Sequence, residues 1–242
     1  MTSLLIAEGV QIEGRLKPTD LRCEPGQLIA IIGPNGAGKT SLLRALAGIE
    51  LDRGLVLVDG EDIAQAPPPR RMKLLSYLPA TRSLVWPISS RDVIALGLPS
   101  LDDRRIDDLI QLLELERVAT RPVNNLSTGE RTRVLIARSL AAQPRLLLLD
   151  EPLANLDPYW VLRALELMRE AAKAGSAVIA SLHDLSQLTS FDRVMLVDDG
   201  RIAADGTAGQ LLQSNELAAA FRVERHNEGW RISLPADPLS SR

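Results

Sequence analysis

The chain has few of the features that mark membrane, secreted or nucleic-acid-binding proteins. It has 242 residues and is 45% hydrophobic, yet no apolar run approaches the ~20 residues that a membrane-spanning helix needs. A single cysteine, Cys23, excludes an internal disulfide and suits a reducing compartment. No charged segment followed by an apolar stretch opens the sequence, so no secretory signal is expected. The net charge is −3 without a basic block, which argues against nucleic acid as a partner. We expect a soluble, cytosolic chain.

What the chain does contain is a glycine-rich motif between an apolar strand and a helix. The stretch Gly33–Thr40, GPNGAGKT, matches G-x-x-x-x-G-K-[ST] at every fixed position. Glycines let the backbone wrap around an anion, and the helix N-terminus adds the positive end of its dipole. Lys39 would meet the β- and γ-phosphates, and the Thr40 hydroxyl would meet Mg²⁺. The residues expected to bind ATP are Gly33, Pro34, Asn35, Gly36, Ala37, Gly38, Lys39, Thr40 and Ser41.

A second element places two carboxylates at the end of an apolar strand. Leu146–Leu149 is four leucines long, as a strand buried on both faces requires, and Asp150 and Glu151 follow it. Ligands of α/β sheets bind at this end of the strands. Because successive strand side chains point opposite ways, we expect different roles. Asp150 suits the Mg²⁺ shell together with Thr40, and Glu151 suits the water that attacks the γ-phosphate.

A third element, Leu126–Glu130 (LSTGE), precedes a predicted helix. Ser127 and Glu130 have the spacing of a capping box, which would be a purely structural role. A capped helix N-terminus is also an anion site. The spacing by itself favours the cap, and both readings stay open at this point.

The order of these elements predicts an α/β nucleotide-binding core with an inserted helical segment. We place the core at 1–79 and 141–213, the helical subdomain at about 80–140, and a small C-terminal extension with a disordered tail at 214–242. Pro67–Pro69 reads as an exposed, stiff connection. The expected strands are 4–12, 21–32 with a turn at Gly26, 55–58, 74–78, 146–150, 177–181 and 194–198. The expected helices are 39–48, 90–98, 104–118, 130–142, 158–174 and 185–188.

Taken together, Gly33–Thr40, Leu126–Glu130 and Leu146–Glu151 resemble the ATP-binding subunit of ABC transporters, a P-loop NTPase fold with an inserted helical subdomain. The resemblance covers nearly the whole chain and implies ATP hydrolysis with Mg²⁺. It implies that Ser127 and Gly129 bind the γ-phosphate held by a second copy in a head-to-tail dimer. Ala154–Asp157 (ANLD) is similar to the D-loop, which places Asp157 near the dimer seam. His183 matches the switch histidine that contacts the γ-phosphate, so Glu151 and His183 are the expected catalytic residues.

The chain departs from the family pattern at several positions. Thr128 and Glu130 replace a glycine and a glutamine of the signature motif. Ala80 stands where the family has the Q-loop glutamine. The aromatic side chain that stacks on adenine in the family is missing, because no aromatic residue precedes Tyr77. How adenine is held is therefore open, with Ile12 and Arg15 as candidates.

Other segments are similar to the importer ATPases for cobalamin, haem and iron–siderophore complexes. These are the short aromatic-free N-terminal run, Trp86-Pro87 with Asp92–Gly97, and Leu217–Phe221. The resemblance implies transmembrane permease subunits as partners, contacted by an exposed patch of Val85, Trp86 and Ile88. It also implies an indirect link to a periplasmic or surface binding protein and a place at the cytoplasmic face of the inner membrane. The alternative is a soluble, non-transport ABC ATPase acting on ribosomes or DNA, which would be expected to carry tandem cassettes, a long coiled coil or basic patches.

Overall fold

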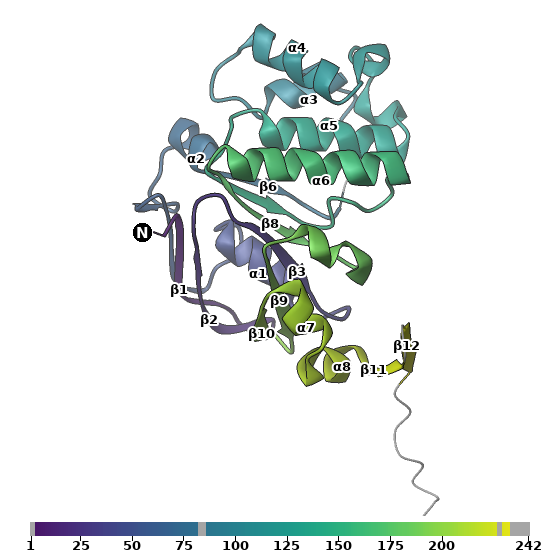
Figure 1. Cartoon of the computed structure of the whole chain (residues 1–242). Coiled ribbons are helices and arrows are strands. Elements are labelled where there is room, and N and C mark those ends of the chain that lie inside the picture. The colour runs from purple at the N-terminus through teal and green to yellow at the C-terminus, as the bar shows by residue number, and fades with distance from the viewer. Residues whose placement is uncertain (1–2, 82–85, 227–228, 233–242) are drawn as a thin grey trace, which may run out of the picture.

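The computed structural model describes residues 3–81, 86–226 and 229–232 as an α/β chain built around a six-stranded sheet (Figure 1). The strand order is β10-β9-β3-β8-β7-β6, parallel except for the hairpin of β9 and β10. The three central strands are buried at every residue, which is why they read as continuous apolar runs. The strands are β3 (Leu28–Ile32), β6 (Leu75–Leu78), β7 (Leu146–Leu149), β8 (Ala177–Ser181), β9 (Arg193–Asp198) and β10 (Arg201–Gly206).

A second, antiparallel sheet packs over helix α1 (Lys39–Leu46) on one face of the central sheet. It runs β2 (Leu16–Cys23), β1 (Leu5–Ile12), β4 (Arg53–Val58) and β5 (Glu61–Asp62). Ile29 and Ile31 of β3 share one core cluster with α1 and this sheet, whereas Ala30 and Ile32 belong to the cluster on the other face. The period-2 alternation of a strand thus ties β3 to both layers.

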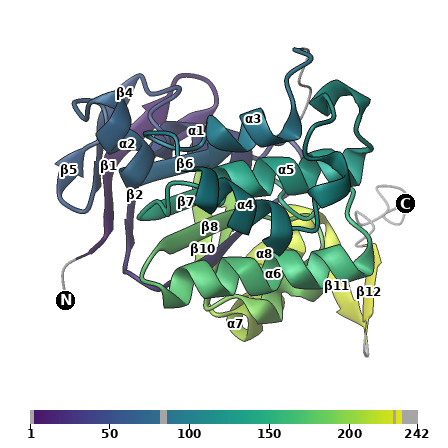
Figure 2. The same cartoon turned by 90° about the horizontal axis from the view of Figure 1, so that it is seen from above.

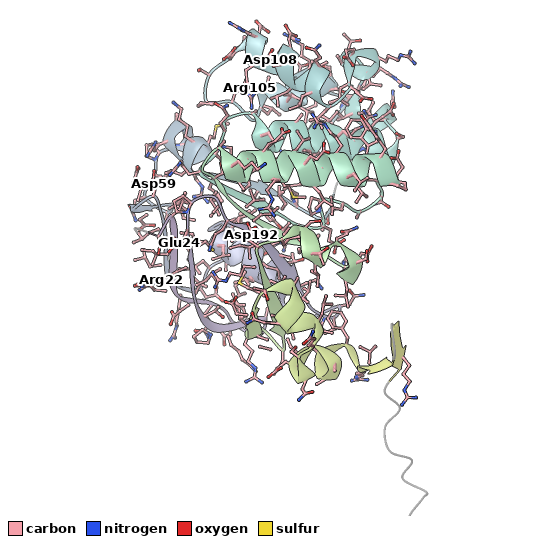
Figure 3. The ribbon with its side chains drawn as sticks, in the orientation of Figure 1. Arg22, Glu24, Asp59, Arg105, Asp108 and Asp192 are labelled. Atoms are coloured by element: carbon pink, nitrogen blue, oxygen red, sulfur yellow. The ribbon has the colours of Figure 1, made fainter. Side chains whose placement is uncertain are left out.

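Between β6 and β7 the described residues form helices: α3 (Ser90–Ala95), α4 (Asp103–Leu112), two 3₁₀ turns and α5 (Thr128–Leu140). Figure 1 shows this segment stacked above α6 (Pro158–Lys173), away from the second sheet. Arg105, labelled in Figure 3, donates to the carbonyl oxygens of Leu140 (3.0 Å) and Ala141 (3.3 Å). Because those carbonyls end α5, this side chain ties α4 to the last turn of α5.

The C-terminal part lies beyond β10 and contains α7 (Ala208–Leu212), α8 (Asn215–Phe221) and the hairpin of β11 (Val223–His226) and β12 (Gly229–Ile232). Figure 1 shows α7, α8 and this hairpin at the lower end of the molecule, well below α6, although α6 and α7 overlap in the view from above in Figure 2. The expected disordered tail lies outside the described residues. Among the residues described, no helix is both long and apolar enough to cross a bilayer.

Four sequence expectations are wrong in detail. The Pro67–Pro69 segment opens a helix, α2 (Pro68–Leu74), because proline fits the first turn, where its missing N–H has no intrahelical partner. The strand expected from residue 21 begins at Leu16, paired with β1. The helix expected over 104–118 ends at Leu112, and Glu116–Val118 is a 3₁₀ turn. Ile88 is half-buried against the main core rather than exposed.

Candidate functional site

The phosphate-loop motif forms a tight turn between β3 and α1, with glycine where the backbone demands it. Gly33 has φ +153°, and a Cβ atom there would lie 2.1 Å from the carbonyl oxygen of Val197. Gly38 caps α1 with φ +108°. Both positions are conformations that side chains other than hydrogen rarely allow, so the glycines of the motif are required by the backbone itself.

Lys39 lies inside this turn with only 7% of its surface exposed. Its Nζ donates to the carbonyl oxygens of Gly33 at 2.6 Å and Pro34 at 3.1 Å. Burial lowers the pKa of the Lys39 ammonium, and the nearby carboxylates of Glu151 and Asp150 partly oppose that shift. The loop thus folds around its own cation, at the place where the sequence predicts the β- and γ-phosphates.

Asp150 directly follows β7 and is a buried carboxylate with one oxygen hydrogen-bonded and the other without a hydrogen-bond partner among the described residues. Its exposed fraction is 1%, and its Oδ1 accepts a hydrogen bond from the Ser181 hydroxyl at 2.7 Å. Its Oδ2 is buried without a hydrogen-bond partner among the described residues. A buried anionic oxygen needs a compensating group, and a hard divalent cation bound also by phosphates and the Thr40 hydroxyl fits that need.

Glu151 turns away from Asp150 for a different reason than strand alternation. The strand ends at Leu149, and Glu151 has φ +53°, in the left-handed region. Its backbone N–H donates to the Ser181 hydroxyl at 2.8 Å, and its Oε1 lies 2.6 Å from His183 Nε2. The expectation that alternating strand geometry separates the two carboxylates is therefore corrected: a left-handed turn separates them.

A cavity of about 590 Å³ joins the phosphate loop to this acidic end, a size suited to a small-molecule ligand. Glu151 and His183 line it, but Ser127, Gly129 and Asp157 do not. The rest of its wall comes from the β1–β2 turn and the β9–β10 turn. Its lining residues are Gln11, Gly14, Arg15, Leu16, Lys17, Pro18, Asn35, Gly36, Ala37, Gly38, Lys39, Thr40, Ser41, Glu151, His183, Asp199 and Gly200.

The third motif forms the capping box that its spacing predicts. The Ser127 hydroxyl accepts from the Glu130 N–H at 3.2 Å, and the Glu130 carboxylate accepts from the Ser127 N–H at 2.8 Å. These hydrogen bonds hold the pKa of the Glu130 carboxyl below its usual value. A Cβ atom at Gly129 would lie 3.6 Å from the carbonyl oxygen of Asn155, so α5 begins beside the Ala154–Asp157 loop. In that loop, Asp157 caps α6 by accepting from the Trp160 N–H at 3.0 Å.

One feature of the site escaped the sequence reasoning. Ser181 connects Asp150 and Glu151, and its signal was the hydroxyl at the end of a buried strand, two residues before His183. Of the two residues that the sequence offered for holding adenine, Ile12 is buried (2% exposed) and does not line the cavity, whereas Arg15 does.

Comparison with known proteins places this geometry in a family. The family model for ABC transporters matches residues 16–154. Over 224 residues the chain is 36% identical to the hemin import ATP-binding protein HmuV of Streptomyces coelicolor, covering 88% of this chain and 80% of that protein. It is 36% identical over 234 residues to the protein of that name from Rhodopseudomonas palustris, covering 89% of each. It is also 34% identical over 226 residues to the cobalamin import ATP-binding protein BtuD of Halobacterium salinarum, covering 89% of this chain and 55% of that one.

Solved structures agree with the sequence relatives. The ATP-binding subunit of an ABC transporter superposes with a TM-score of 0.78 at 25% identity, covering 89% of this chain and 94% of that one. A dimeric ATP-binding cassette with bound ADP and Pi shares the fold, with a TM-score of 0.75 at 22% identity over 84% of this chain and 98% of that one. The chain therefore belongs to the ABC transporter family, as one of its ATPase subunits.

Proposed function

We propose that this ATPase powers a bacterial importer of cobalamin or a related metal chelate such as haem or an iron–siderophore complex, through ATP-driven dimerisation. The hemin and cobalamin import relatives supply the cargo class. The observation that carries the dimer is the division of the motifs within one chain. The cavity holds the phosphate loop, Glu151 and His183, whereas Ser127 and Gly129 lie outside its lining. A second copy would bring the N-terminus of α5, with Ser127 and Gly129, to the phosphates.

The residues divide the chemistry among themselves. Lys39 and the N–H groups of the loop grip the β- and γ-phosphates. Thr40 and Asp150 would hold Mg²⁺, which when bound neutralises phosphate charge. Glu151 orients the attacking water and accepts its proton, and His183, 2.6 Å from it, positions that carboxylate and faces the γ-phosphate. Ser127, Gly129 and Asp157 complete the site of the partner copy.

The permease contact is proposed on the helical subdomain. Trp86, Leu96 and Leu101 are exposed by 76%, 59% and 74%. A groove of about 150 Å³ between β6, α3 and α5 lies beside Leu96. Val85 of the expected patch lies outside the described residues. Exposed apolar side chains and a groove in the same part of the chain fit a membrane-protein loop, which would place the chain at the cytoplasmic face of the inner membrane. The binding protein would then act only through the permease.

We also propose the unit boundaries of the sequence analysis. The core would comprise 1–79 and 141–213, the helical subdomain about 80–140, and the extension 214–242. The described residues between β6 and β7 form only helices, which supports the boundaries near residues 80 and 140 between the core and the helical subdomain.

The first test separates the binding of the phosphates by Lys39 from the activation of the attacking water by Glu151. Lys39→Ala should abolish tight ATP binding, because the buried cation of the loop is lost. Glu151→Gln should retain ATP but stop turnover, and it should accumulate as an ATP-bound dimer in gel filtration with light scattering. The exposed Glu170→Gln is the matched control and should hydrolyse ATP normally. Unimpaired hydrolysis by Glu151→Gln would contradict its assignment.

The second test addresses cargo. Deletion of the gene in its own host should abolish uptake of cobalamin, haem or a ferric siderophore, measured with labelled compounds. The wild-type gene should restore that uptake and Glu151→Gln should not. If uptake of all three compounds survives deletion, the importer proposal fails while the ATPase assignment stands.

A further inference from the structure

The base end of the nucleotide cavity has no aromatic side chain. Glu151 and His183 mark the γ-phosphate end, and the remaining wall is the β1–β2 turn with the β9–β10 turn. None of the described residues that line the cavity is Phe, Tyr or Trp, and the sequence has none of these before Tyr77. A base at this wall therefore needs another flat surface.

Arg15 is seated directly against the phosphate loop. Its carbonyl oxygen would lie 3.2 Å from a Cβ atom at Gly38 and 2.9 Å from one at Gly200. Its N–H closes the β1–β2 turn onto the Ile12 carbonyl at 3.0 Å. The backbone of Arg15 is thus fixed beside the N-terminus of α1, while the residue lines the cavity and its side chain remains 53% exposed.

The guanidinium of Arg15 forms an ion pair with Glu50, which also binds Arg44, and these three residues are called the clamp. Its Nη1 lies 2.9 Å from Glu50 Oε2, and Arg44 Nη1 donates to Glu50 Oε1 at 3.1 Å. Arg44 belongs to α1, the helix that the phosphate loop opens, so Glu50 links Arg15 to that helix. Each Glu50 oxygen contacts one arginine, and the contact with Arg15 is a single ion pair without hydrogen-bond geometry, which tethers the planar guanidinium at one nitrogen.

We propose that the Arg15 guanidinium, paired with Glu50, is the platform on which the nucleobase stacks, replacing an aromatic side chain. The inference rests on the proposed ATPase function and names its base-binding residue. Bases stack on guanidinium planes as they do on aromatic rings. Lys17 lines the same wall, but its ammonium is not planar and is paired with Asp199 at 2.6 Å. Because every base has a π face, this platform discriminates weakly between purines.

The test compares a ligand that has a base with one that does not. Calorimetric titration of the full chain with Mg²⁺ would measure Kd for AMP-PNP, a non-hydrolysable ATP analogue, and for tripolyphosphate. The readout is the ratio of the two affinities. A loss of affinity caused by charge alone affects both ligands and therefore cancels in this ratio. Arg15→Ala should weaken AMP-PNP relative to tripolyphosphate by about 5- to 100-fold. Arg15→Lys keeps the charge and loses the plane, so it should lower the ratio as Arg15→Ala does.

Two further variants sharpen the outcome. Arg15→Tyr supplies a ring and should restore a ratio close to wild type. The control Arg22→Ala removes an exposed cation of β2 outside the cavity lining and should leave the ratio unchanged. GMP-PNP should bind the wild type within about tenfold of AMP-PNP. An unchanged ratio in Arg15→Ala, even with both affinities reduced, would overturn this inference alone. Failure of the wild-type chain to bind either ligand would overturn the proposed function as well.

Discussion

At the scale of single residues, one hydroxyl organises the acidic end of the cavity. Ser181 is fully buried, donates to Asp150 Oδ1 and accepts from the Glu151 N–H. It therefore fixes the carboxylate expected to meet the metal and the backbone of the residue expected to meet the water. Neither contact is visible from spacing, because Ser181 lies 30 positions from Glu151 in the sequence.

We expect Ser181→Ala to lower both stability and turnover. The change leaves a buried carboxylate oxygen without its donor, which costs about 1–3 kcal/mol of unfolding free energy. Misplacing Asp150 and Glu151 should reduce kcat more than ATP affinity. Ser176→Ala is the matched control, because Ser176 lies just before the other end of β8 and donates to the Pro144 carbonyl. Urea unfolding and ATPase rates would be measured on the same preparations. A wild-type kcat for Ser181→Ala would show that the hydroxyl is only structural.

At the scale of elements, the N-terminus of helix α5 shows how one residue, Ser127, can have two roles. The Ser127 hydroxyl accepts from the Glu130 N–H in the first turn of α5, and the Glu130 carboxylate accepts from the Ser127 N–H just before the helix. A role in phosphate binding would be additional and would need a second copy. The two roles predict different losses in the same variant.

Ser127→Ala should cost about 1 kcal/mol as a lost cap, a fall in Tm of about 2–4 °C for a chain of this size. If Ser127 also binds phosphate in trans, ATPase activity and ATP-driven dimerisation should fall far more than that stability loss explains. We expect the second result. Thr207→Ala is a control, because Thr207 makes the same kind of capping box on α7, away from the cavity. If Ser127→Ala lowers the stability but leaves the ATPase activity unchanged, Ser127 acts only as a helix cap.

The loop after β6 carries the departure at Ala80. The alanine side chain has neither a hydrogen-bond donor nor an acceptor. It therefore cannot connect the groove proposed for the permease with the metal and the water, as a glutamine side chain could. We expect appreciable ATPase activity without permease and modest stimulation by cargo. Ala80→Gln should raise the stimulated-to-basal ratio in reconstituted vesicles, and Thr81→Gln should not. Tight cargo dependence in wild type, with no change in Ala80→Gln, would show that coupling runs through other contacts.

Elements with a strong apolar pattern were predictable, and those fixed by tertiary contacts were not. The runs in β3 and β7 are strands because both faces are buried, and the four leucines of β7 signal that directly. The first half of β2 is polar and contains Pro18, so only its pairing with β1 makes it a strand. The α2 helix was missed because three prolines suggested an extended connection.

The site divides in the same way. The fixed spacing of the phosphate loop located Lys39 and Thr40, since short-range geometry suffices there. The clamp of Arg15, Glu50 and Arg44 joins side chains up to 35 positions apart and leaves no local pattern. Only the folded chain brings it to the cavity.

At the scale of the whole molecule, the two core clusters are separated by the central sheet, and the lone cysteine lies in one of them. Cys23 is fully buried in the cluster with α1 and the second sheet. Burial raises the pKa of its thiol to about 12, with the nearby Arg193 opposing and Asp205 adding to the shift. The thiol is therefore protonated and shielded in the native chain.

We expect Cys23 to resist iodoacetamide at pH 8 and to react only from the globally unfolded state, in proportion to the equilibrium population of that state. Saturating Mg-ATP at 100 times its Kd should slow the reaction about 100-fold, because ligand binding stabilises the native state by about 2.7 kcal/mol. The pKa of the thiol in the folded chain lies above its ordinary value of 9.0, so the unfolded state loses this proton first. Stability should therefore fall as pH rises from about 9 towards 12, and Cys23→Ala should lack that component. Fast labelling of the native chain would contradict the burial.

The left-handed backbone at Glu151 has a consequence for how this sequence persists through generations. A glutamate at φ +53° sits in a conformation that glycine adopts without penalty. Replacement by glycine would relieve about 1 kcal/mol of strain and would remove the carboxylate from the cavity. Selection for folding alone would thus favour losing this residue, and selection for turnover is what would keep it. In a lineage that no longer needs the cargo, position 151 is where drift should first be visible.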